Sequence, residues 1–287
     1  MQLLVKWELI PPGVDPIMFL VVATLAVMLL SAAKSGFGGS MGMLSTPLMI
    51  LACKGQSQLA TGIMLPVMIA CDYVTLVVWW GKWDRRNVRM LVPGMLVGVL
   101  LGGLTLWAIF GTPPAGGRVP ASAPTQSMMH SNAILNLSIG LVAVGFVVLQ
   151  VLRSWKGELN VFKPTAVQAT IAGAAAGYVS TLAHTAGPIT NMYLLPQNMD
   201  KGRFVATTVL YYWIGNQVKL VPYAMLGMLS TPSLKADLLL LPGMILGAVL
   251  GIVLHHRVSD KQFNTIIYAF LGVIGLYMIA TSVGQVF

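Results

Sequence analysis

The sequence predicts an all-α integral membrane protein of about ten helical segments, two of them short or broken, in two inverted-topology repeats of five. Of the 287 residues, 56% are hydrophobic and 9% are charged, whereas a soluble domain carries about 25% charged residues. Residues 38–47 (GGSMGMLSTP) match 187–196 (GPITNMYLLP), and at the same spacing 93–102 (PGMLVGVLLG) match 242–251 (PGMILGAVLG). A duplicated apolar chain with glycine-broken segments in matching places is typical of secondary transporters.

Ten apolar segments are expected to be helices. They cover residues 17–33, 40–53, 58–80, 88–110, 131–152, 165–183, 188–199, 203–227, 238–256 and 264–284. Because a helix needs about 20 residues to cross the hydrocarbon core, the second and seventh segments are too short to cross it alone. The glycine-containing turns before them, at 36–39 and 185–188, are therefore expected below the membrane surface, where protein or a watery cavity meets them.

The repeats predict the domain organisation. Residues 1–152 form the first repeat, with a long external loop at 111–131. Residues 153–164 form a cytoplasmic linker, and residues 165–287 form the second repeat. If all ten segments cross, one side receives most of the basic residues, and the other receives Lys6, Lys54, Arg118 and Lys235. The positive-inside rule then makes the linker cytoplasmic and both termini external. Whether the two short segments cross fully stays open.

The two glycine turns are the predicted anion-binding elements, because a helix start presents unpaired N–H groups and a partial positive charge. Two starts, one per inverted half, are expected to face each other near the midplane. The side chains around them offer donors and no carboxylate, which suits an oxyanion. For Lys34, the alternative is a side chain that reaches the cytoplasmic surface. The predicted substrate-binding residues are Lys34, Ser35, Gly38, Gly39, Ser40, His184, Thr185, Gly187, Thr190 and Asn191.

Charged residues inside apolar segments are the candidates for coupling or gating, since they are costly in a membrane. Asp72 is the only acidic residue within the ten predicted segments, and Lys219 is its basic counterpart, beside Asn216 and Gln217. Their depths along the two helices argue against a salt bridge between Asp72 and Lys219. Asp72 is either a coupling-ion or proton site or a partner of a backbone or hydroxyl group. Lys219 reaches outward, contacts an anion or pairs at a distance, and His184 could carry a proton.

Several functional classes leave no signature in the sequence. No GxSxG, HExxH or GxxxxGK[ST] motif is present, so neither a hydrolase nor an ATPase is predicted. Ser180 and His184, four residues apart, are the one weak hydrolase candidate. Cys53 and Cys71 lack metal-ligand spacing and are interpreted as small helix residues. We expect no cofactor, no metal and no nucleic-acid partner, because the net charge of +9 lies in short connections and reports topology.

Residues 34–48 (KSGFGGSMGMLSTPL) resemble the glycine-rich opening of the sulfite exporter TauE/SafE family of membrane permeases. Residues 177–196 and the PGM elements at 93–98 and 242–247 support the resemblance, which covers nearly the whole chain. It implies an inner-membrane permease that moves sulfur-containing oxyanions such as sulfite, or sulfonates such as sulfoacetate, usually outward. The exact ligand stays open, because the second half departs from the glycine-rich form at His184, Pro188 and Asn191.

The leading hypothesis is a secondary transporter, most simply an exporter, of a small sulfur-containing anion. It would work by alternating access and be coupled to protons, although nothing in the sequence separates H⁺ from Na⁺. Membrane lipid is its other expected partner, and a homo-oligomer is left open. One alternative is a passive small-anion channel that uses the same site. The other is a non-transport membrane protein, either a hydrolase or a scaffold.

Overall fold

The computed structural model describes residues 15–37, 43–111, 126–156, 165–197, 199–254 and 260–286. Within these ranges the chain forms ten helical segments and no strand, when adjoining helical turns are counted as one helix. The all-α prediction is therefore confirmed. Five of the helices are long and apolar enough to cross a membrane, and they cover Pro16–Gly36, Ser57–Val78, Arg85–Phe110, Met129–Val148 and Ser233–Leu254.

The first five segments match the predicted order. They are α2 (Pro16–Met18), η1 (Phe19–Ala23) and α3 (Thr24–Phe37), which are continuous, then α4 (Ser45–Ala52), α5 (Ser57–Val78), α6 (Arg85–Phe110) and α7 (Gln126–Lys156). Aspartates fix two of the helix starts. Asp15 accepts the Met18 N–H at 2.8 Å, and Asp84 accepts the Asn87 N–H at 3.0 Å. Each side chain satisfies one of the unpaired donors of a first turn.

The second five segments repeat this order. They are α8 (Ala166–Ala183), α9 (Gly187–Leu194) with the short turn η3 (Leu195–Gln197), α10 (Lys201–Met225), α11 (Thr231–Leu254) and α12 (Asp260–Val286). Thr165 and Gln168 form a capping box at the start of α8, and Asp200 accepts the Arg203 N–H at 2.9 Å at the start of α10. These caps satisfy N–H donors of the first turn and fix where the two helices begin.

Three predicted boundaries are wrong. Helix α3 runs to Phe37, so Gly36 belongs to the helix rather than to the turn before α4. Helix α7 begins at Gln126, so residues 126–131 are helical rather than part of a loop. Helix α11 begins at Thr231, which places Asp237 inside a helix, because Pro232 in the first turn starts the helix earlier than its apolar run. Asp72 is therefore not the only acidic residue within the helices.

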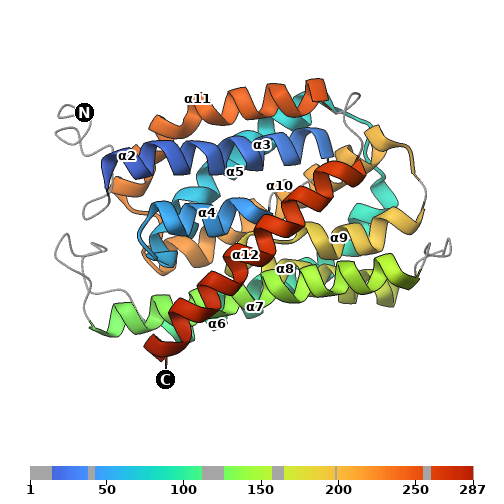
Figure 1. The fold of residues 1–287 in the computed structure, drawn as a ribbon. Helices are drawn as coiled ribbons and strands as arrows, with labels where there is room; N and C mark the ends of the chain where they lie inside the picture. Colours follow the sequence, from blue (N-terminus) through green and yellow to red (C-terminus); the bar gives the residue numbers. More distant parts are fainter. Residues whose placement is uncertain are drawn as a thin grey trace.

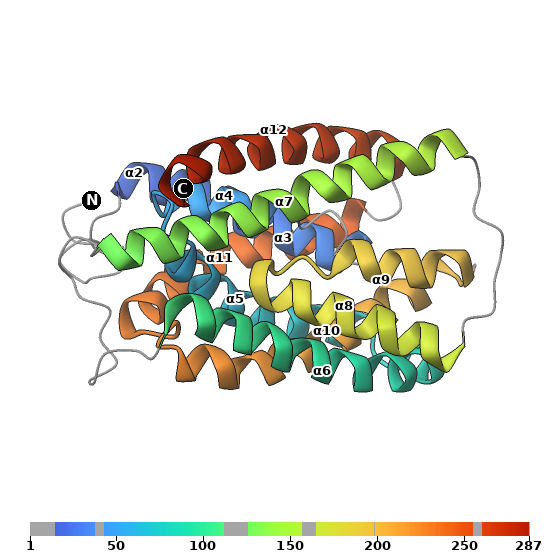
Figure 2. The ribbon, with the colours of Figure 1, turned by 90° about the horizontal axis from the view of Figure 1, so that it is seen from below.

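Helices from the two halves pack against each other in pairs. Helix α3 lies beside α11, α6 beside α8, and α7 beside α12, while α5 and α10 contact each other in the interior (Figures 1 and 2). The helices run roughly along one common axis (Figure 2). Most of the contacts between the long helices thus join a helix of the first half to a helix of the second.

Glycines allow the closest of these approaches. A methyl group on Gly98 of α6 would overlap the Ala174 carbonyl oxygen of α8 and lie 2.7 Å from the Tyr178 nitrogen. A methyl group on Gly177 of α8 would lie 2.6 Å from the Met95 carbonyl oxygen. Backbones that approach this closely pack by van der Waals contact, which is a main source of helix association in lipid.

The two short helices lie toward opposite ends of the bundle (Figure 1). Helices α4 and α9 have eight residues each and are about 12 Å long, far less than the membrane core. They lie on opposite sides of the centre in Figure 1. Figure 2 shows α8 ending and α9 beginning near the middle of the bundle. Residues 38 and 39 of the predicted turn at 36–39, and the start of the predicted segment 40–53, lie outside the described residues.

Replacing Gly98 by alanine should weaken the α6–α8 contact. The added methyl group meets backbone atoms that cannot rotate away, so we expect a loss of about 1–3 kcal/mol of unfolding free energy. The measurement is denaturant unfolding of the purified protein in detergent. Gly145→Ala in α7 is the matched control, because a methyl group there meets no atom within 4 Å. Equal stability of the two variants would contradict the packing argument.

Candidate anion-binding site

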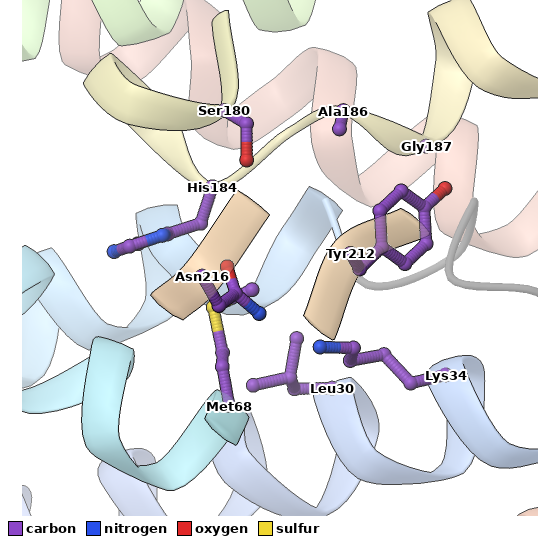
Figure 3. A pocket seen from close by; sticks show the side chains of 9 residues that line it. All are labelled: Leu30, Lys34, Met68, Ser180, His184, Ala186, Gly187, Tyr212 and Asn216. Atoms are coloured by element: carbon purple, nitrogen blue, oxygen red, sulfur yellow. The ribbon is translucent and has the colours of Figure 1, made fainter. Parts of the chain in front are cut away.

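A small cavity of about 20 Å³ lies where α3, α5, α8, α9 and α10 meet. This volume holds about one water molecule. In Figure 3 the side chains from α3 lie on one side of the cavity, and the α8–α9 connection lies on the other. The lining residues are Leu30, Lys34, Met68, Ser180, His184, Ala186, Gly187, Tyr212 and Asn216.

The break between α8 and α9 forms one wall of the cavity. His184 ends α8 in the left-handed region, at φ 55° and ψ 26°, and its N–H still bonds to the Ser180 carbonyl at 2.9 Å. Helix α9 begins at Gly187, which lines the cavity. The Thr190 N–H bonds to the Ala186 carbonyl at 3.1 Å and closes the first turn. The N-terminal end of α9, which favours negative charge, therefore adjoins the cavity.

Lys34 and Asp72 form a buried ion pair at this site. The Lys34 Nζ contacts Asp72 Oδ1, and the two side chains are 2% and 0% exposed. Asn216 Nδ2 donates to Asp72 Oδ2 at 2.6 Å. The alternative in which Lys34 reaches the cytoplasmic surface is therefore excluded, and the expectation that the site lacks a carboxylate is wrong. Because Lys34 continues the helix one turn after Leu30, both side chains project from the same face of α3.

Lys219 is the second buried cation of the site. Its Nζ donates to Ser180 Oγ at 3.0 Å and lies 3.2 Å from His184 Nδ1, and the residue is 1% exposed. Of the three alternatives for Lys219, the one in which it reaches outward is excluded by this burial. Among the described residues Lys219 makes no ion pair with Asp72, as the argument from helix depth predicted.

His184 uses both ring nitrogens in this arrangement. Its Nε2 lies 3.0 Å from the Thr61 carbonyl oxygen, which can only accept a hydrogen bond, so Nε2 carries the proton. Its Nδ1 faces the Lys219 ammonium and accepts. The imidazole is therefore neutral, and it joins α8 to α5 while it orients Lys219.

Tyr212 connects α10 to the first turn of α9. Its hydroxyl lies 2.5 Å from Thr190 Oγ1, and Thr190 also bonds to the Gly187 carbonyl at 3.0 Å. The Lys34 ammonium lies over the Tyr212 ring, 5.7 Å from its centroid, within the range of a cation–π contact. The start of α9 and the ion pair thus share one aromatic side chain.

The remaining predicted site residues take other positions. The Ser35 hydroxyl donates to the Ala248 carbonyl of α11 at 2.9 Å, so it serves helix packing. Thr185, Asn191 and Gln217 do not line the cavity, and each keeps a buried polar atom without a partner among the described residues. Three predicted residues lie outside the described residues, and they are Gly38, Gly39 and Ser40.

The sequence reasoning missed the role of Ser180 and Tyr212, although a signal was present. Ser180 and His184 are four residues apart, as are Tyr212 and Asn216, and residues at this spacing share a helix face. Leu30 with Lys34 follows the same spacing. Polar residues that have a cavity-lining partner four positions away therefore mark the helix faces that line the cavity.

With both lysines protonated and Asp72 ionised, the described site would carry an excess of one positive charge. Lys34 and Lys219 are both buried. Among the described residues Asp72 contacts Lys34, whereas Lys219 bonds to Ser180 and contacts no carboxylate. A buried charge without a counter-ion is unstable in a membrane. The arrangement therefore favours an anionic ligand.

The comparison with known protein families agrees with this chemistry. A family model described as Sulfite exporter TauE/SafE matches residues 23–278, and the chain belongs to this family. No curated protein and no solved structure matched the chain. The family is one of transporters rather than enzymes, and with its apolar helices the chain is a multi-pass membrane protein.

Removing one partner of the Lys34–Asp72 ion pair should lower the unfolding free energy, and removing both partners should restore most of it. Lys34→Met leaves a buried carboxylate, and Asp72→Asn leaves a buried ammonium, so each should cost about 3–5 kcal/mol. The double variant Lys34→Met/Asp72→Asn leaves neither charge and should recover most of the loss. Denaturant unfolding in detergent at one pH measures all four proteins. Losses that simply add in the double variant would show that the two side chains do not interact.

Proposed function

We propose that this member of the TauE/SafE family is a secondary transporter that exports a small sulfur-containing anion. The substrate would be sulfite or an organosulfonate, carried across the inner membrane by alternating access and coupled to protons. The observation that supports this most is that Lys34 and the start of α9 line one buried cavity, while Lys219 is bonded to the lining residue Ser180. Each of these three features favours a negative ligand.

The donors around the cavity suit an oxyanion. Lys34 lines the cavity and supplies charged N–H groups, and Ser180 and Asn216 supply neutral donors from α8 and α10. Lys219 does not line the cavity but donates to Ser180. Hydrogen bonds to a charged acceptor are about twice as strong as those between neutral groups. The oxygens of sulfite or of a sulfonate would accept them from several directions, while Leu30 and Met68 contribute apolar surface.

The size of the cavity supports alternating access rather than a passive channel. A cavity of about 20 Å³ holds about one water molecule, and a sulfur oxyanion has at least four heavy atoms. Its entry therefore requires helices to move apart. A channel would need a continuous pore with several weak sites, whereas a closed central site between two halves suits a transporter.

The helix pairing supports the two inverted repeats, 1–152 and 165–287. If the halves are exchanged, α3 takes the place of α8 and α6 that of α11. The α3–α11 pair then becomes the α8–α6 pair, and the α5–α11 contact becomes the α10–α6 contact, all of which occur. The α7–α12 pair maps onto itself. A rocking motion of one half against the other would follow from this relation.

Charge at one end of the bundle supports the proposed orientation. Arg203 at the start of α10 donates to Asp84 at the start of α6 at 2.8 Å, so these two helix starts share one end. Basic residues gather there, and they are Lys82, Arg85, Arg86, Arg89, Lys201 and Arg203. The positive-inside rule makes this end cytoplasmic, which places the linker inside the cell and both termini outside.

Counterflow in liposomes tests the proposal. Vesicles that contain the protein and are loaded with unlabelled sulfite, thiosulfate or sulfoacetate should take up the labelled anion with saturation. Lys219→Met removes a charged hydrogen-bond donor worth about 1.5–3 kcal/mol, so it should raise the half-saturating concentration about ten- to a hundredfold. Lys201→Met is the matched control, because Lys201 is exposed and lies outside the cavity.

Two outcomes would overturn the proposal. The absence of saturable counterflow for every sulfur anion would remove the transport function. Single-channel currents with a flux that rises in proportion to concentration would instead identify a passive channel.

A further inference from the structure

We propose that Asp72 is an internal counter-ion that competes with the transported anion for Lys34, so that each bound anion is accompanied by one proton on Asp72. This inference rests on the proposed transport function. It adds how the proton and the anion share one site. When no anion is present, the Asp72 carboxylate pairs with the Lys34 ammonium.

The contacts of Lys34 are the first reason. Among the described residues its ammonium contacts Asp72 Oδ1 and lies over the Tyr212 ring. Lys34 also lines the cavity, so the same ammonium faces both its counter-ion and the space for a ligand. While Asp72 holds this ammonium, the charge of Lys34 is neutralised. An anion that binds Lys34 therefore competes with the carboxylate of the same protein for one ammonium.

The second reason to propose competition for Lys34 is the set of polar groups that face the interior around Asp72. Lys34 comes from α3, and Asn216 and Lys219 come from α10. Helix α8 presents His184 to α5 through the Thr61 carbonyl. Asp237 is the acidic residue of α11, and its carboxylate has no hydrogen-bond partner among the described residues.

The other helices that contact α5 add no further charge near Asp72. Helix α4 has no titratable side chain, and the titratable residues of α7 lie toward its ends, at His130, Arg153 and Lys156. Lys34 is therefore the one cation that contacts the Asp72 carboxylate within the described ranges.

The displaced carboxylate cannot stay charged beside an incoming anion. Two negative groups on one ammonium in a low-dielectric site repel each other strongly. A proton on Asp72 Oδ1, the oxygen released by Lys34, removes the repulsion and gives the anion another O–H donor. Oδ2 keeps the hydrogen bond from Asn216. No bond other than the O–H bond forms, and the proton comes from the solvent.

The charge balance agrees with outward transport. When both lysines are protonated, the site has one excess positive charge with Asp72 ionised and two with Asp72 protonated, from Lys34 and Lys219. A dianion is therefore fully neutralised only in the protonated site. Such an anion and its proton together carry one net negative charge, which an inside-negative potential drives outward by about 2.3 kcal/mol per 100 mV.

Anion binding at several pH values tests the proposal on the purified full-length protein in detergent. Thiosulfate and methanesulfonate are suitable probes, because their own charges do not change across the physiological pH range. For the wild type we expect the Kd to rise by up to tenfold per pH unit and one proton to be taken up per anion bound, measured with a pH indicator in weak buffer. For Asp72→Asn, which keeps an acceptor for Asn216 but no charge, we expect a Kd independent of pH and no proton uptake.

Asp237→Asn is the matched control, because it removes another buried carboxylate that has no contact with Lys34. It should keep the pH dependence of the wild type. A pH-dependent Kd in Asp72→Asn, or loss of the dependence in Asp237→Asn alone, would overturn the proposal. If Asp72→Asn does not fold without ligand, the proton uptake of the wild type tests the proposal alone. Anion binding without proton uptake would contradict the proposal, but it would not contradict the transport function. Absence of binding and counterflow for every sulfur anion would overturn both this inference and the proposed function.

Discussion

The structure depends on the requirement that a charge inside the membrane be paired. Two lysines, Lys34 and Lys219, lie almost fully buried among apolar helices, where an unpaired ammonium is costly. Lys34 is held by Asp72, and Lys219 is held by Ser180 and a neutral His184. The positions of α3, α5, α8 and α10 around the cavity are therefore fixed by charge as well as by close packing of glycines.

The same requirement connects the architecture to transport. The broken helix at α8–α9 supplies polar backbone in the interior of the bundle, which is tolerated only where protein or a cavity meets it. Tyr212 joins the start of α9 to the side chain of Lys34. A ligand that changed the partner of Lys34 would thus act on α3, α5, α9 and α10 together. Anion binding at the site could therefore move these helices, and helix movement is needed for an anion to enter or leave the closed cavity.

The sequence predicted the helices well because apolar length and glycine spacing are local properties. It also identified Lys34, His184, Gly187 and Asn216, which line the cavity. It missed the ion pair between Lys34 and Asp72, since that contact depends on how two helices are rotated against each other. Asp237 was missed because its polar first turn hid the start of α11. Gly38 and Gly39 of the predicted first-half turn lie outside the described residues, so their predicted role stays a prediction.

The most direct test of the account is the distance between the Lys34 ammonium and the Asp72 carboxylate with and without an anion. Solid-state NMR of the protein in lipid, labelled with ¹⁵N on lysine and ¹³C on aspartate, measures this contact through its dipolar coupling. The account predicts a strong coupling in the empty protein, which is lost when sulfite saturates the site. A coupling that is unchanged in a protein that binds and transports sulfite would contradict it.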